Sequence, residues 1–190
     1  METLYFLYYP ELLNVLLLLF IVELIVTIVL RVKENVRGKE KSKKVQAIYP
    51  ELSKKELKFR ETSIMSYYRI NSNQSFRDKL AIFFVFVLIA AVVMIPIFLF
   101  YENYSGLCFA GATVCLSLAI FTPSERNYMQ ILDFWEKYLE ENPDNPLKVV
   151  PRSDKKDLRL IKFAQFNAFL RILCGLYSLF MGLLLFQQNL

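Results

Sequence analysis

The sequence contains no histidine and only three cysteines among its 190 residues. Histidine is the commonest general base in enzymes and a common metal ligand, so its absence removes both roles. Cys108, Cys115 and Cys174 lie inside apolar runs and show no CxxC spacing, which argues against a zinc site and against a secreted disulfide framework. We therefore interpret all three as small packing residues.

Other enzyme signatures are missing as well. The sequence has no Gly-rich phosphate-binding loop, no recognisable pair of nucleophile and base, and no Asp/His constellation inside its apolar runs. We therefore expect a protein that is not an enzyme, with no catalytic residues, no metal and no cofactor.

Charge is almost absent from four long runs, which span residues 12–30, 80–100, 106–121 and 163–186. A helix needs about 20 apolar residues to cross a hydrocarbon core of about 30 Å, and these runs meet or approach that length. The sequence, which is 55% hydrophobic, therefore predicts an all-α fold: an integral membrane four-helix bundle with two cytoplasmic amphipathic helical segments.

The distribution of Lys and Arg predicts the orientation of these helices. Residues 31–79 contain 14 basic and 6 acidic side chains, and residues 122–162 contain 8 of each. By the positive-inside rule both large loops are cytoplasmic and both termini lie outside, in what we expect to be the bacterial inner membrane. The predicted order is an outer tail and transmembrane helix (1–30), a basic cytoplasmic segment (31–79), a transmembrane hairpin (80–121), a cytoplasmic amphipathic helix and linker (122–162), and a last transmembrane helix with an outer tail (163–190).

A basic stretch directly follows the first run. It is expected to bind anionic lipid or an acidic partner through Arg31, Lys33, Arg37, Lys39, Lys41, Lys43 and Lys44. Direct binding of nucleic acid is disfavoured, because the stretch lacks the interleaved aromatic residues on which bases stack.

A helix is predicted to begin near Lys54, since Ser53 and Glu56 have the spacing of a capping box. Its expected apolar face consists of Leu57, Phe59, Ile64, Met65, Tyr67 and Tyr68.

A second amphipathic helix is predicted after the sequence "TPSE", with Thr122 as its N-cap, Pro123 in its first turn and Glu125 completing a capping box. The polar face of this helix is acidic, which disfavours contact with an anionic leaflet, so the apolar stripe is expected to pack on protein. We predict that this stripe docks a cytoplasmic partner through Tyr128, Ile131, Leu132, Trp135, Tyr138 and Leu139. The alternatives are packing of the stripe on the 54–70 helix of the same chain or on another protomer.

Small residues are expected to let the transmembrane helices approach closely, because lipid tails are as apolar as leucine and give helices no hydrophobic reason to associate. The third run has small residues on two faces, so its helix is predicted to lie between neighbours. The residues assigned to helix packing are Ala112, Cys115, Ala119, Gly175, Ser178 and Gly182. Such faces also suit contacts between subunits, and we expect a homo-oligomer.

Glu23 is the one acidic residue inside the first run. A charge at the centre of a bilayer costs about 3 kcal/mol on insertion scales, so such a group needs a partner or a function. Arg171 is the only basic residue inside any run, and Thr27 lies one turn from Glu23 on the same face. Three interpretations remain open: a structural pair of Glu23 and Arg171; a protonated Glu23 with Arg171 extended to the headgroups; and a carboxylate ring in an oligomeric pore.

The arrangement of four spans, short outer turns and two cytoplasmic helical segments resembles the membrane subunit of Kiwa-type bacterial antiphage systems over the whole chain. The resemblance implies an oligomer in the inner membrane that senses a disturbance and recruits a soluble effector, and it assigns no site residue. Four-span immunity proteins against pore-forming bacteriocins have a similar outline.

We therefore expect a non-enzymatic, oligomeric inner-membrane sensor or scaffold that recruits or regulates a cytoplasmic partner in phage defence. The alternatives are an oligomeric ion channel and an immunity protein against a pore-forming bacteriocin.

Overall fold

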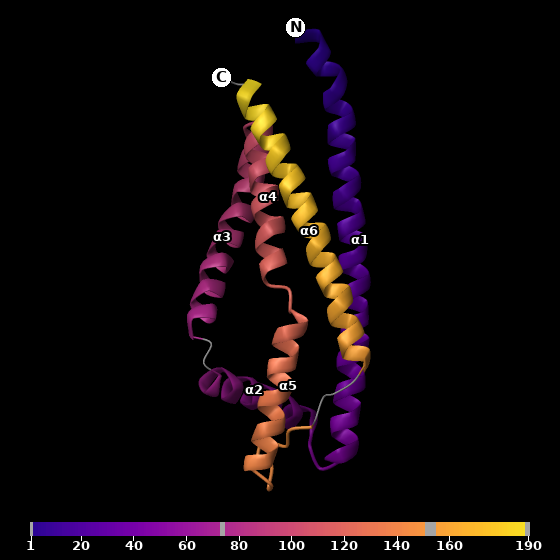
Figure 1. The fold of residues 1–190 in the computed structure, drawn as a ribbon, viewed down its shortest axis with the longest axis vertical. Coiled ribbons are helices and arrows are strands. Elements are labelled where there is room, and N and C mark those ends of the chain that lie inside the picture. The colour runs from indigo at the N-terminus through magenta and orange to yellow at the C-terminus, as the bar shows by residue number, and fades with distance from the viewer. Residues whose placement is uncertain (1, 73–74, 151–154, 189–190) are drawn as a thin grey trace. The chain divides into compact units, whose positions relative to one another are not determined.

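The computed structural model describes residues 2–72, 75–150 and 155–188 (Figure 1). These residues form helices and no strand, as the sequence predicted. The helices are α1 (Glu2–Ile48), α2 (Lys54–Asn71), α3 (Ser75–Phe100), α4 (Tyr104–Ile120), α5 (Glu125–Glu141) and α6 (Lys155–Gln188). Four helical stretches, in α1, in α3, from α4 into α5 and in α6, are long and apolar enough to cross a membrane.

The chain forms two compact units. The bundle unit comprises Met1–Val29, Asp78–Thr122 and Ala164–Leu190, and the polar unit comprises Leu30–Arg77 and Pro123–Phe163. Both α1 and α6 are continuous helices that contribute residues to each unit.

In the bundle unit, α4 contacts both α3 and α6. Gly106 of α4 lies under the ring of Phe98 from α3, and Gly175 of α6 lies against Leu116 of α4. Of the six residues assigned to packing, Ala119 is half-buried and Ala112, Cys115, Gly175, Ser178 and Gly182 are buried. Small residues on two faces of α4 thus let this helix approach a neighbour on each side.

Replacing Gly175 with alanine is expected to destabilise the bundle unit by about 1–3 kcal/mol through overpacking. A Cβ at this position would lie 2.8 Å from Cγ of Leu116 and 3.4 Å from the carbonyl oxygen of Ala112. Thermal unfolding of the purified protein in detergent measures the effect.

Gly38→Ala is the matched control, because no atom lies within 4 Å of a Cβ built at Gly38. It is expected to stabilise α1 by about 0.5–1 kcal/mol, since glycine is unfavourable inside a helix. If Gly175→Ala and Gly38→Ala changed the unfolding temperature by the same amount and in the same direction, this account of the packing would be contradicted.

The core of the polar unit is aromatic and is shared by α2, α5 and the segment after α5. Its buried members are Ile64, Trp135, Tyr138 and Val149. The rings of Tyr67 and Tyr138 lie edge to face with centroids 5.1 Å apart, and those of Tyr68 and Phe134 do so at 5.0 Å. Such pairs stabilise by more than the area they bury.

The capping box at the start of α2 is confirmed. Ser53 Oγ accepts a hydrogen bond from the amide of Glu56, and the Glu56 carboxylate accepts one from the amide of Ser53. The apolar face of α2 is narrower than predicted, because Phe59 and Met65 are 74% and 64% exposed. Both residues lie away from the side of α2 that α5 covers. The prediction that Phe59 and Met65 belong to the packed apolar face was therefore wrong.

The predicted cap of α5 was also wrong. The helix begins at Glu125 and its N-cap is Ser124, whose Oγ accepts a hydrogen bond from the amide of Asn127 at 3.2 Å. Thr122 instead donates back to the carbonyl of Leu118 at the end of α4. Pro123 therefore precedes the cap, where its lack of an N–H group costs no helical hydrogen bond.

Candidate functional site

A cluster of four polar side chains joins α1 to α6 within the bundle unit. We call Glu23, Thr27, Asn167 and Arg171 the polar cluster. Arg171 Nε donates to Glu23 Oε1 at 2.7 Å, and Thr27 Oγ1 donates to the same oxygen at 2.7 Å. Arg171 Nη2 and Asn167 Nδ2 both donate to Thr27 Oγ1, at 3.0 and 2.9 Å.

The spacing of these residues on the two helices explains why they meet. Glu23 and Thr27 are four residues apart on α1, and Asn167 and Arg171 are four residues apart on α6. Residues at this spacing lie on one face of a helix. Because α1 and α6 run antiparallel here, Glu23 faces Arg171 and Thr27 faces Asn167.

The polar cluster is largely buried, so its polar atoms depend on one another for hydrogen bonds. The side chains of Glu23 and Arg171 are each 14% exposed, and Asn167 is 0% exposed. The Thr27 hydroxyl accepts from two donors and donates to one acceptor, so its hydrogen-bonding capacity is used. Asn167 Oδ1 is buried and has no hydrogen-bond partner among the described residues.

The contacts are those of the first of the three interpretations, a structural pair. In the second, Arg171 would extend away from Glu23, and in the third, Glu23 would face an aqueous pore. The carboxylate instead accepts two hydrogen bonds from its own chain. A paired carboxylate and guanidinium satisfy each other where water is scarce, and breaking such a pair is costly.

The predicted docking stripe on α5 packs against its own chain. Trp135 and Tyr138 are buried, and Ile131 and Leu139 pack on the same core. Leu132 is half-buried, and Tyr128 donates to Asp157 Oδ2 at 3.4 Å. Trp135 and Tyr138 therefore have no free surface for a partner in this structure, and intramolecular packing, one of the alternatives from the sequence, fits these contacts.

The basic stretch divides into two groups. Arg37 is buried and its Nε lies 2.7 Å from Asp157 Oδ1, while Lys41 Nζ lies 2.9 Å from Asp157 Oδ2. Both side chains pair with Asp157 within the polar unit, and the burial of Arg37 leaves it little surface for a lipid or a partner, whereas the Lys41 side chain is 32% exposed. The exposed members are Arg31, Lys33, Lys39, Lys43 and Lys44.

Asp157, like Asn167 of the polar cluster, is a residue that sequence reasoning missed. Its side chain is 4% exposed and receives contacts from α1 and α5. Burial raises the pKa of this carboxyl, but hydrogen bonds and charge from Arg37 and Lys41 outweigh burial and hold the pKa below its usual value. The available signal was a lone acidic residue in the basic sequence "KKDLRLIK".

Among residues 2–72, 75–150 and 155–188, no group of three or more Cys, Asp or Glu side chains could hold a metal ion. Comparisons with protein-family models, with curated proteins and with solved structures found no match.

Proposed function

We propose that this chain is a multi-pass protein of the bacterial inner membrane that senses a change in the bundle and recruits a cytoplasmic partner without catalysis. In the proposed orientation both termini lie outside, and residues 31–79 and 122–162 lie in the cytoplasm. The four apolar helical stretches and the positive-inside rule support this arrangement.

The observation that carries the proposal is the continuity of α1 and α6. Each helix runs unbroken from the bundle unit into the polar unit. Ionic contacts join the two helices in both units, through Glu23 and Arg171 in one and through Arg37 and Asp157 in the other. In this proposal a change in the contact between the helices in the bundle unit reaches the polar unit along these continuous helices.

The exposed part of the basic stretch is the proposed contact surface. Arg31 and Lys33 follow the apolar run and are proposed to contact anionic headgroups. Lys39 and Lys43 lie one turn apart on α1, are both exposed, and are proposed to bind an acidic surface on a soluble protein. Phe59 and Ile70, which are exposed on α2, add apolar area to the polar unit.

Charge reversal tests this surface. Lys39→Glu combined with Lys43→Glu is expected to abolish the capture of a soluble protein by crosslinking in inside-out membrane vesicles, because two attractive contacts become repulsive. Mass spectrometry of the crosslinked products measures capture.

Glu136→Lys combined with Glu140→Lys is the matched control, since these residues are also exposed and one turn apart, on α5. It is expected to leave capture unchanged. Equal capture by both double variants would refute the assigned surface, and capture from the outside of intact spheroplasts would refute the orientation.

A homo-oligomer is part of the proposal. Only 6% of the most apolar stretch of α1, and 6% of that of α3, is buried within the chain. This leaves apolar surface for lipid and for a second copy. The resemblance to Kiwa-type membrane subunits further suggests phage defence as the setting, and an effector gene adjacent to this one would support it.

A further inference from the structure

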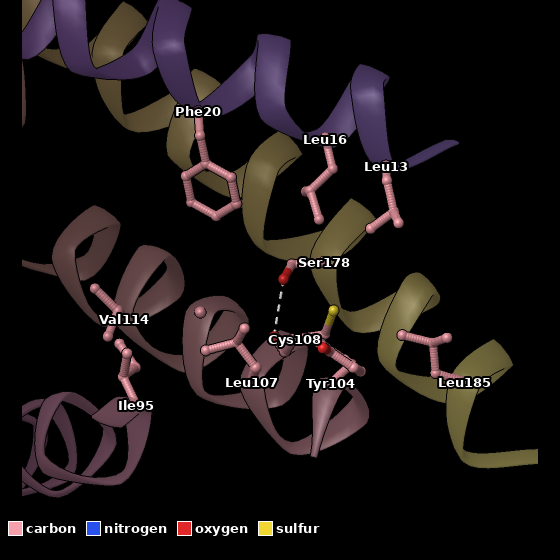
Figure 2. A pocket seen from close by; sticks show the side chains of 11 residues that line it. Leu13, Leu16, Phe20, Ile95, Tyr104, Leu107, Cys108, Val114, Ser178 and Leu185 are labelled. Atoms are coloured by element: carbon pink, nitrogen blue, oxygen red, sulfur yellow. Dashed lines mark hydrogen bonds between the residues drawn. The ribbon is translucent and has the colours of Figure 1, made fainter. Parts of the chain in front are cut away.

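The bundle unit contains an apolar cavity of about 700 Å³ (Figure 2). Four helices line it. The lining residues are Leu13, Leu16 and Phe20 from α1, Ile95 from α3, Tyr104, Leu107, Cys108, Gly111 and Val114 from α4, and Ser178 and Leu185 from α6. A volume of this size lies within the range of about 300–1,000 Å³ typical of small-molecule sites.

The cavity lining is almost wholly apolar, and only Tyr104, Cys108 and Ser178 contribute side chains with a polar atom. The Ser178 hydroxyl donates its proton to the backbone carbonyl of Cys108 at 2.8 Å, as the dashed line in Figure 2 shows. Leu13, Leu16 and Phe20 project from α1 towards this pair. The lining therefore suits a hydrocarbon and gives little to a charged or hydrogen-bonding molecule.

The cavity extends along only part of the bundle. It runs from Leu13 to Phe20 on α1 and from Tyr104 to Val114 on α4. At 1.5 Å per residue these segments measure about 10 and 15 Å. A complete hydrocarbon core is about 30 Å thick, so the cavity matches the depth of about one leaflet.

The polar cluster lies next to the part of α1 that lines the cavity. Glu23 follows Phe20 by less than one turn of α1, and its contact with Arg171 holds α6 against α1 at that level. Nearer the N-terminus of α1 the two helices remain in contact, because the Tyr177 hydroxyl of α6 donates to the backbone carbonyl of Leu12 at 3.1 Å and Met181 packs in one core with Leu16. These contacts and the polar cluster both join α1 to α6, and residues of α3 and α4 complete the cavity lining.

We propose that the cavity binds an acyl chain of a membrane phospholipid from the outer leaflet, an assignment of leaflet that rests on the proposed orientation. A transmembrane helix of a second copy would need a groove along the full hydrocarbon core, and the lining residues span only part of that length. An acyl chain matches both the length and the lining. An occupying chain packs beside the contacts that join α1 to α6, so a change in the surrounding lipid alters the packing of the two helices through which the sensor acts.

Photolabelling tests the proposal. The purified full-length protein is placed in nanodiscs of phosphatidylethanolamine and phosphatidylglycerol that contain a phosphatidylcholine with a diazirine midway along one acyl chain. After illumination, tandem mass spectrometry, which assigns the label to single residues, is expected to find it in the cavity peptides on Leu16 and Phe20 or on Leu107 and Gly111, and not on Leu17.

Filling the cavity is expected to remove this label. A Cβ at Gly111 would lie 3.4 Å from Ser178 Oγ and 3.8 Å from Phe20 Cζ, which is ordinary contact, so the larger side chain of Gly111→Leu enters the cavity. Val114→Phe fills it from another position and keeps the test valid if Gly111→Leu fails to fold. Ala90→Leu, which adds the same kind of bulk on the exposed side of α3, is expected to retain the label.

Three results would overturn the proposal: labelling of the cavity peptides that persists in both filling variants, labelling confined to lipid-exposed positions such as Leu17, and competition by free fatty acid but not by phospholipid. A crosslink between two copies at these positions would assign the cavity to a second chain. None of these results depends on partner capture, so the proposed function and the lipid site fail separately.

Discussion

Replacing Arg171 with methionine is expected to destabilise the folded bundle by about 3–5 kcal/mol, because the substitution leaves the Glu23 carboxylate buried without its cation. Methionine retains much of the length and apolar volume of the arginine stem, so the effect reports the lost charge. The substitution also removes the hydrogen bond that Arg171 Nη2 donates to Thr27 Oγ1. Equilibrium unfolding in mixed micelles with increasing denaturing detergent measures the change in free energy.

The double variant Glu23→Gln with Arg171→Met separates charge from packing. It is expected to recover most of the lost stability, because a neutral amide can still accept the hydrogen bond from Thr27. Arg31→Met is the surface control, since the Arg31 side chain is 77% exposed and its removal is expected to cost less than about 1 kcal/mol. A double variant as unstable as Arg171→Met alone would show that the ion pair is not the origin of the loss.

Replacing Asp157 with asparagine is expected to have the second largest effect, a destabilisation of the polar unit by about 3 kcal/mol, typical of a broken buried ion pair. The neutral amide could not balance the charges of Arg37 and Lys41, which lie 2.7 and 2.9 Å from the carboxylate oxygens. Arg37 would keep its contact with Glu40 at 2.7 Å, which limits the loss. Near-ultraviolet circular dichroism of the Trp135 cluster during chemical denaturation reports this unit.

The effect of Asp157 is expected to depend on pH. Its pKa in the folded chain is below the ordinary value of 3.8, so its stabilising contribution is complete above that value and is lost as the pH falls through the folded pKa. The difference in stability between the wild type and Asp157→Asn should therefore be constant near neutrality and shrink below about pH 4. A difference that stays constant into strong acid would contradict the role of the carboxylate.

Sequence patterns predicted the all-helical fold, the apolar helices and the capping box of α2, because these depend on neighbouring residues. Hydrophobic periodicity also identified the stripe on α5. Periodicity defines a face but not the surface that covers it, so the stripe was assigned to a partner although α2 covers Trp135 and Tyr138. The cap of α5 was misplaced for a local reason, since both Thr122 and Ser124 can cap a helix and only the end of α4 decides between them.

The candidate site was predictable in part. Glu23 and Arg171 could be paired because they are the only opposite charges within the apolar runs, and Thr27 followed from helical spacing. Asn167 gave no comparable signal, because an amide in a helix becomes significant only when the register of α1 against α6 is known. The same holds for Arg37, whose burial depends on an aspartate 120 residues away.

The antiparallel register of the polar cluster restricts the relative motion of α1 and α6. A slip by one turn in one direction would place Glu23 opposite Gly175, which offers no side-chain donor, and in the other direction opposite Asn167, which carries no charge. Sliding α1 along α6 by one turn in either direction would therefore leave the Glu23 carboxylate without a cation. A scissor-like opening that pivots on Glu23 and Arg171 would keep this pair and break either the hydrogen bond from Tyr177 to Leu12 or the contact of Arg37 with Asp157, so a signal carried as a change in angle would require one of these two contacts to open.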